Sequence, residues 1–215
     1  MIGLFGGTFD PVHLGHLDVA RAARRALNLD RVWMIPAKFP PHRGRPLATE
    51  ADRVAMLTQA IQDEPGFEIS TVELDAPGPS YTAHTLARLG IDGSALDRWC
   101  FITGADAFSD IATWFDYPAL LDRCHFAVVS RPGCGVHALP AALPSLASRM
   151  VPAGENPVSA ASRPGIFLID APTAPVSSTS VRAAITRGLP LTGLVPDAVA
   201  DYIASHRLYL EAHGR

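Results

Sequence analysis

The feature that most constrains this chain is a regular alternation of short apolar runs with helical segments. Runs typical of strands occupy residues 2–5, 32–36, 67–74, 99–103, 126–130 and 166–169. Helical spacing of apolar residues occurs at residues 14–27, after Thr49, and at 82–89, 180–186 and 196–205. This alternation predicts the α/β class: a Rossmann-like, doubly wound parallel sheet with helices on both faces. Ligands of such sheets bind beyond the carboxyl ends of the strands, near the switch in strand order.

The length of the chain suits one domain. We expect its 215 residues to form a single unit over residues 1–215, with a small C-terminal helical part from about residue 176. Residues 131–164 are rich in Pro, Ala, Ser and Gly, which predicts a long loop or a small insertion. No internal repeat is visible in the sequence.

Composition excludes several classes of protein. The net charge of −3 argues against broad attraction to nucleic acid, and no apolar run approaches the roughly 18 residues of a membrane span. No secretory signal precedes the first apolar run, and the three cysteines show no CxxC spacing, so we expect a cytoplasmic protein without disulfides. The sole lysine, Lys38, follows Ala37 and precedes Phe39, which rules out a Walker A loop.

A glycine-rich turn with two histidines follows the first apolar run, at residues 6–16 (GGTFDPVHLGH). Gly6 and Gly7 let the backbone turn sharply and approach a ligand closely. His13 and His16 are three positions apart at the start of a predicted helix, so both rings can lie on one face. The N–H groups and the positive dipole end of that helix favour an anion. We therefore predict a phosphate site, although a lone histidine in such a turn is more often structural.

A second candidate anion site lies at residues 176–182 (VSSTSVR). Hydroxyl groups and backbone N–H groups at a helix start, with Arg182 in the first turn, make a phosphate cradle. Taken alone, the segment is equally well explained as an ordinary Ser/Thr helix cap. A dehydrogenase is excluded, because the turn Gly3-x-x-Gly6-Gly7 is not GxGxxG and residues 32–38 contain no acidic residue for a ribose.

The two segments, in this order, resemble the HxGH nucleotidyltransferase superfamily, whose late motif ISSTxxR is matched with Val176 in place of isoleucine. Further segments resemble bacterial nicotinate-nucleotide adenylyltransferases: residues 40–43 (PPHR), 80–86 (SYTAHTL) and 104–106 (GAD), and Trp114 with Tyr117. The resemblance spreads over most of residues 1–188. One departure is Arg43, which stands where the family usually has lysine; it keeps the charge but binds oxyanions as a planar fork.

The resemblance implies transfer of AMP from ATP to nicotinic acid mononucleotide, in NAD biosynthesis, by in-line attack without a covalent intermediate. It implies catalytic roles for His13, His16 and Arg182, with His16 at the α-phosphate. The ATP-binding residues that it implies are Gly6, Gly7, Thr8, Phe9, His13, His16, Asp106, Ser178, Thr179 and Arg182. Those implied for the mononucleotide are Arg43, Thr82, Trp114 and Tyr117. It also implies Mg²⁺, held by phosphates and water and by no dedicated protein ligand.

Two alternatives remain open at this point. The same machinery serves other acceptors, nicotinamide mononucleotide or phosphopantetheine among them, and the pocket around Thr82 and Trp114 must decide between carboxylate and amide. A nucleotide-binding sensor without catalysis is the other alternative, although a sensor has little need for both His13 and His16. The sequence predicts no nucleic-acid or membrane partner and leaves a homo-oligomer open.

Overall fold

A seven-stranded parallel sheet forms the centre of the computed structural model, which describes residues 1–41, 44–153 and 163–210. The strands are β1 (Ile2–Gly7), β2 (Arg31–Pro36), β3 (Phe67–Ile69), β4 (Trp99–Gly104), β5 (His125–Val129), β6 (Met150–Pro152) and β7 (Ile166–Ile169). Their order is β3-β2-β1-β4-β5-β7-β6, and every paired strand runs parallel to its neighbour. The order reverses between β1 and β4, so the predicted switch point lies between these two strands.

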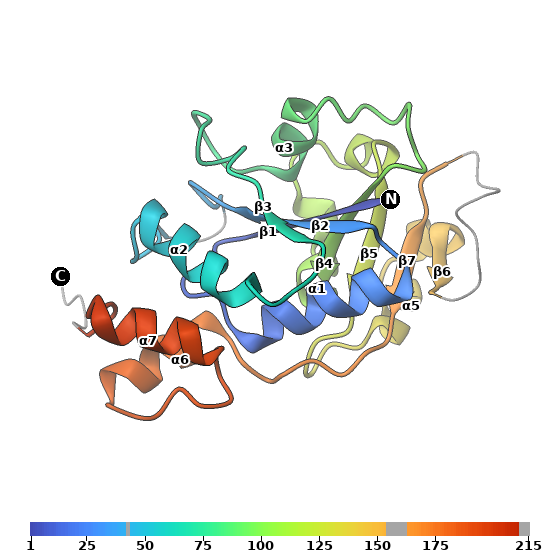
Figure 1. Ribbon diagram of the computed structural model, residues 1–215. Helices are drawn as coiled ribbons and strands as arrows, with labels where there is room; N and C mark the ends of the chain where they lie inside the picture. Colours follow the sequence, from blue (N-terminus) through green and yellow to red (C-terminus); the bar gives the residue numbers. More distant parts are fainter. Residues whose placement is uncertain (42–43, 154–162, 211–215) are drawn as a thin grey trace.

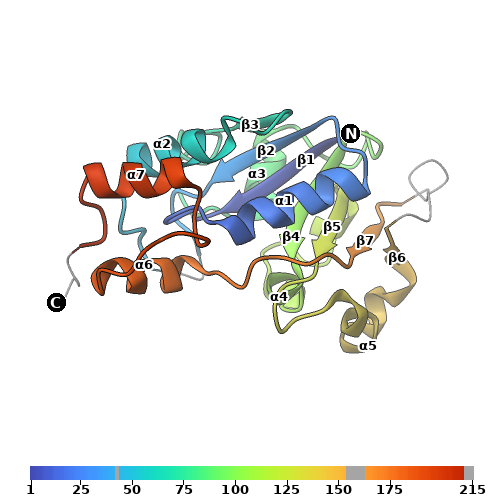
Figure 2. The same ribbon diagram turned by 60° about the horizontal axis from the view of Figure 1, so that its bottom comes forward.

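Helices cover both faces of the sheet (Figure 1). They are α1 (Leu14–Ala26), α2 (Glu50–Ile61), α3 (Thr82–Arg88), α4 (Ala105–Phe108), α5 (Leu139–Ala142), α6 (Ser178–Thr186) and α7 (Asp197–Ser205). Short 3₁₀ turns occupy Ile111–Thr113, Ala119–Asp122, Val136–Ala138 and Pro144–Arg149. Figure 2 shows α6 and α7 together beyond one end of the sheet, with α7 beside α2. The predicted α/β, doubly wound architecture is confirmed.

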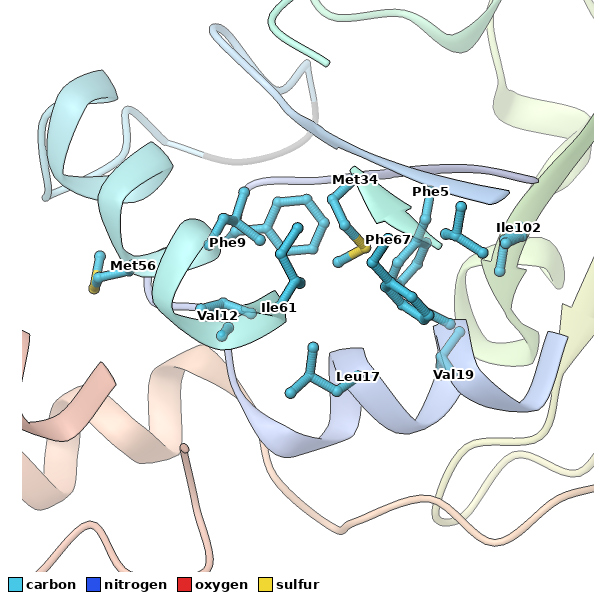
Figure 3. Close-up of a cluster of buried hydrophobic side chains, with 14 of the residues drawn as sticks. Phe5, Phe9, Val12, Leu17, Val19, Met34, Met56, Ile61, Phe67 and Ile102 are labelled. Atoms are coloured by element: carbon cyan, nitrogen blue, oxygen red, sulfur yellow. The ribbon is translucent and has the colours of Figure 1, made fainter. Parts of the chain in front are cut away.

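Successive strand residues point to opposite faces and so build two buried clusters. On β1, Leu4 belongs to the cluster under α3 and α4, whereas Phe5 belongs to the cluster under α1 and α2. The cluster under α1 and α2 is called the first buried cluster below, and the one under α3 and α4 the second. Figure 3 draws the first, in which Phe9 and Met34 lie between the sheet and the helices. Both clusters are needed because a parallel sheet has no face exposed to water.

Two expectations about element boundaries were wrong. The run 67–74 is a strand only to Ile69, because the chain turns where the backbone N–H of Asp75 donates to Thr71 and the Thr71 hydroxyl donates to Asp75. Helix α6 begins before Ser180, at Ser178, because the Ser177 hydroxyl caps it. Residues 131–164, expected to form a long loop or a small insertion, include α5 and the short strand β6, while 154–162 lie outside the described residues.

Across the three described ranges of the chain, no helix is both long enough and apolar enough to span a bilayer.

The buried imidazole of His125 makes the stability of the fold depend on pH. Its Nδ1 accepts the backbone N–H of Gly165 at 2.9 Å, and burial lowers its pKa below the ordinary value. The unfolded chain therefore binds more protons than the folded one as the pH falls through about 6.5, and stability is lost in acid. We expect unfolding by urea to shift to lower concentration between about pH 7.5 and about pH 5.

The matched variant is His125→Asn, whose amide oxygen can accept the same N–H but does not titrate in this range. The slope of unfolding free energy against pH should flatten in this variant. His137→Gln is the control, because His137 is exposed and pairs with the exposed Asp170. An unchanged slope in His125→Asn would contradict the assignment.

Candidate active site

A cavity of about 350 Å³ opens at the carboxyl ends of β1 and β4, at the switch point. Its size lies within the range of small-molecule sites. The described residues that line it include ten of those predicted for the site: Gly6, Gly7, Thr8, Phe9, His13, His16, Thr82, Asp106, Trp114 and Ser178. The structure thus brings residues from β1, α1, α3, α4 and α6 around one space. Thr179, Arg182 and Tyr117 do not line it, and Arg43 lies outside the described residues.

Side chains from distant parts of the chain donate hydrogen bonds to backbone carbonyls of residues 6–16, called the first loop below. Arg53 Nη1 donates to the carbonyls of Thr8 at 2.8 Å and of Ala37 at 2.7 Å. Arg182 Nη1 donates to the Asp10 carbonyl at 2.6 Å, and the Ser178 hydroxyl donates to the Pro11 carbonyl at 2.9 Å. Burial lowers the pKa of Arg53, which is 1% exposed, below its ordinary value. Because these carbonyl dipoles are occupied, they do not repel an anion beside the loop.

The two histidines form a stacked pair at the start of α1. Their ring centroids lie 3.6 Å apart with 25° between the planes, and His13 is 2% exposed. His16 Nδ1 accepts the backbone N–H of His13 at 3.3 Å. A nitrogen that accepts cannot carry the proton, so the neutral ring holds it on Nε2. His16 also lines the cavity.

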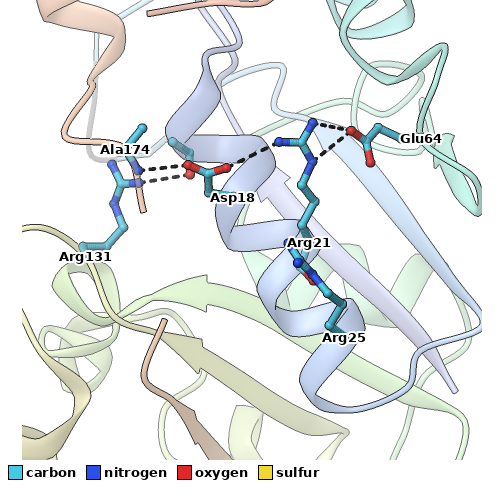
Figure 4. Close-up of polar contacts among 7 residues, drawn as sticks. Asp18, Arg21, Arg25, Glu64, Arg131 and Ala174 are labelled. Atoms are coloured by element: carbon cyan, nitrogen blue, oxygen red, sulfur yellow. Dashed lines mark hydrogen bonds and ion pairs between the residues drawn. The ribbon is translucent and has the colours of Figure 1, made fainter. Parts of the chain in front are cut away.

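Arg131 crosses from the end of β5 to α1 and to the segment before α6. Its Nη1 donates to the carbonyl of Gly15 at 3.1 Å, and its Nη2 donates to that of Val176 at 3.2 Å. A second contact between these parts of the chain is drawn in Figure 4, where Asp18 Oδ2 accepts the backbone N–H of Ala174 at 2.9 Å. These hydrogen bonds connect residues 6–16 and the start of α1 with residues 174–176. Arg131 itself lines the cavity.

The second predicted anion segment serves first as a helix cap. Ser177 Oγ accepts the backbone N–H of Ser180 at 3.0 Å, as the plain capping interpretation requires. Ser178 reaches the cavity wall, whereas Arg182 donates to Asp10 and, at 3.4 Å, to the Thr179 hydroxyl. The capping interpretation is thus confirmed, while the anion site stays a prediction, with Ser178 at the cavity wall.

Comparison with known proteins agrees with this geometry. Residues 4–184 match the model of the cytidylyltransferase-like family. Nicotinate-nucleotide adenylyltransferases from Roseiflexus sp. (strain RS-1) and Synechococcus sp. (strain JA-3-3Ab) are each 41% identical, over 97% and 98% of this chain and 97% and 95% of theirs. The chain belongs to the nicotinate-nucleotide adenylyltransferase family.

A solved structure extends the likeness to the fold of this adenylyltransferase. Plasmodium falciparum nicotinic acid mononucleotide adenylyltransferase complexed with NaAD superposes with a TM-score of 0.72 at 17% identity, covering 97% of this chain and 96% of that one. The putative nicotinate-nucleotide adenylyltransferase from Vibrio parahaemolyticus gives a TM-score of 0.60 at 18% identity, covering 98% and 96%. At these identities the likeness concerns the fold alone.

The other end of the adenylyltransferase cavity holds the residues expected around a pyridine ring. Thr82 and Trp114 line it, and Trp114 follows the 3₁₀ turn Ile111–Thr113. Trp114 also packs edge to face on Phe101, so this partly buried side chain both packs against the second buried cluster and lines the cavity. Tyr117 packs against the same cluster without lining the cavity.

Glu73 is a cavity residue that the sequence analysis missed. It is 6% exposed, and its Oε1 accepts the hydroxyl of Thr85 at 2.5 Å. Burial raises the pKa of this carboxyl above its ordinary value. The sequence did contain a signal: Glu73 lies inside the apolar run 67–74, and a carboxylate in a buried strand needs a hydrogen-bonding partner. The structure places it at the same wall as Ser80 and Thr82.

Gly15 allows the close approach of Arg131, and a methyl group there predicts a measurable defect. A Cβ would lie 2.8 Å from Arg131 Nη1 and 3.0 Å from the Ala174 carbonyl oxygen. We expect Gly15→Ala to lower the unfolding free energy by about 1–3 kcal/mol and to reduce turnover about tenfold.

Gly135→Ala is the matched control. Nothing lies within 4 Å of a Cβ at Gly135, and its φ of −82° suits any residue. It should change stability by less than about 0.5 kcal/mol in the same urea titration. Equal stability and turnover in the two variants would show that the contact with Arg131 has no consequence.

Proposed function

We propose that the chain transfers AMP from ATP to nicotinic acid mononucleotide, giving nicotinic acid adenine dinucleotide and pyrophosphate in NAD biosynthesis. The observation that carries the proposal is the 41% identity to nicotinate-nucleotide adenylyltransferases over nearly the whole of both chains. The cavity at the switch point supports it, because residues of both phosphate segments and of the ring pocket face one space.

The phosphate of the mononucleotide attacks the α-phosphorus of ATP in line, and pyrophosphate leaves. The protein contributes position and charge stabilisation and forms no covalent intermediate. We propose that His16 donates from Nε2 to an α-phosphate oxygen, with His13 stacked behind it. The stacking and the bond from the His13 N–H fix the His16 ring before substrate binds, which keeps reorganisation small.

The negative charge on the leaving pyrophosphate would be stabilised by the second predicted anion segment, residues 176–182. We propose that Ser178, Thr179 and Arg182 bind the β- and γ-phosphates, with Gly6, Gly7, Thr8 and Phe9 shaping the wall. Arg182 donates one hydrogen bond to the Asp10 carbonyl and one to the Thr179 hydroxyl. Because a guanidinium has five N–H groups, the others can donate to phosphate. Asp106, at the start of α4, would accept hydrogen bonds from a ribose or from adenine.

We propose that Mg²⁺ is held here by ATP phosphates and water. Among the described residues no group of three His, Cys, Asp or Glu side chains could hold a metal, and of the cavity carboxylates Glu73 is already engaged by Thr85. When bound, Mg²⁺ neutralises negative charge on the phosphates. The residues of this chain would then act on the oxygens that the ion leaves exposed.

The mononucleotide would occupy the end of the cavity at Trp114. We propose that the indole stacks on the pyridine ring and that Thr82 donates to the nicotinate carboxylate. Tyr117 would support Trp114, and Arg43 would contact the mononucleotide phosphate. We also propose a cytoplasmic location, no nucleic-acid partner, and a single domain over residues 1–215. For the last, Val181 of α6 and Val199 of α7 share a buried cluster with Phe5 of β1.

The test of the function is pyrophosphate release from ATP and Mg²⁺ with three acceptors in parallel: nicotinic acid mononucleotide, nicotinamide mononucleotide and phosphopantetheine. Release with the first acceptor alone is expected. Pyrophosphate release with another acceptor would support AMP transfer but contradict the proposed pyridine pocket at Thr82 and Trp114. Folded protein that binds ATP and releases no pyrophosphate with any of them would favour the sensor.

His16→Ala separates transition-state stabilisation from binding. Removing the donor at the α-phosphate should lower kcat about 100-fold or more while the dissociation constant for ATP changes little. Turnover measured by pyrophosphate release and ATP binding measured by calorimetry provide the two values. Turnover near that of the unmodified enzyme would remove His16 from the reaction.

A further inference from the structure

Asp10, in the middle of the first loop, is a buried carboxylate shared by distant segments. It is 4% exposed. Its Oδ2 accepts the backbone N–H of Leu47 at 2.7 Å, and its Oδ1 accepts that of Ala48 at 3.0 Å. Oδ1 accepts a further donor, the hydroxyl of Tyr209, at 2.8 Å. The backbone carbonyl of the same residue accepts Arg182.

Tyr209 reaches this carboxylate from beyond α7, through an unusual turn. The helix ends at Ser205, and both Arg207 and Tyr209 adopt positive φ, 52° and 62°. Such conformations are uncommon for residues with a side chain and persist where the surroundings hold them. The turn brings the phenol of Tyr209 back against the first buried cluster and onto Oδ1 of Asp10. Burial and the neighbouring carboxylate raise the pKa of this phenol, so it remains a donor.

The consequence of this contact concerns the phosphate site. Asp10 lies between Phe9, which lines the cavity, and Pro11, whose carbonyl accepts Ser178. Rotation of the Asp10 peptide would move Phe9 and release the carbonyl that orients Arg182. A hydrogen bond to a carboxylate is among the stronger ones in a protein, so losing one of the three donors frees this residue to rotate.

We infer that Tyr209 is a positioning residue for adenylyl transfer: through Asp10 it holds the first loop and Arg182 in the geometry that the reaction needs. The inference rests on the proposed function as far as turnover is concerned. Tyr209 does not line the cavity, and its hydroxyl is bonded to Asp10. Its proposed role therefore differs from those of His16 and Arg182, for which we propose direct contact with phosphate.

Tyr202 provides a matched control on the same C-terminal segment. Like Tyr209 it is half-buried, packs on the first cluster and donates its hydroxyl to a carboxylate, Asp52 Oδ1, at 3.0 Å. Asp52 belongs to α2, so the bond between Tyr202 and Asp52 does not involve the first loop. Tyr209→Phe and Tyr202→Phe each remove one hydroxyl, so any shared loss of stability cancels in the comparison.

Steady-state kinetics with ATP and nicotinic acid mononucleotide give the first readout. We expect Tyr209→Phe to have a kcat at least about threefold below that of Tyr202→Phe, with both KM values within about twofold. A smaller difference in kcat would overturn the inference and leave Tyr209 with a structural role only. Thermal melts establish the temperature at which both variants are folded, and the kinetics are measured below it.

Hydrogen exchange gives a second readout that needs no activity. In Tyr209→Phe, amides in peptides covering residues 6–14 and 45–49 should exchange faster than in Tyr202→Phe. Unchanged exchange in both peptides would overturn the inference even if kcat fell. If the unmodified protein were inactive with every acceptor, the proposed function would fail and exchange alone would decide the role of Tyr209.

A double-mutant cycle locates the path of the effect. Asp10→Ala removes the acceptor of the Tyr209 hydroxyl, and adding Tyr209→Phe to it should lower kcat by less than about twofold further, because the bond between the two residues is already absent. Independent effects would mean that Tyr209 does not act through Asp10.

Discussion

The occupation of three loop carbonyls by donors is the interaction on which the site depends. An anion beside a backbone loop is favoured by N–H groups and repelled by carbonyl oxygens. In residues 6–16 the carbonyls of Thr8, Asp10 and Pro11 are taken by Arg53, Arg182 and Ser178. None of these donors is close in sequence to the loop. The proposed phosphate site thus depends on tertiary contacts, even though its motif is a continuous stretch of sequence.

The parallel sheet makes this arrangement possible. Parallel strands deliver their carboxyl ends to one edge, and the reversal of order between β1 and β4 opens a space there. The loop after β1, α4 after β4 and Arg131 after β5 meet at that edge, and Gly15 and Gly104 leave room for the arginine. Arg131 then fixes the segment before α6, which carries the second set of polar groups.

Sequence reasoning predicted what local chemistry determines and missed what long-range contacts determine. Six of the seven strands and the histidine pair followed from short patterns, and the family resemblance added most of the ten cavity residues. The run 67–74 was extended too far because Val72 and Leu74 continue the apolar pattern while the chain already turns at Thr71. Arg53 and Tyr209 carry no local signal: an arginine in an amphipathic helix and a tyrosine in a polar tail are ordinary until the fold places each against the loop.

The bond between Asp10 and Tyr209 joins positions 199 residues apart and so sets an order of events during synthesis. The histidine-bearing loop leaves the ribosome early, but its supports follow at residues 53, 178, 182 and 209. A growing chain therefore carries the two histidines long before it carries the side chains that hold the loop around them.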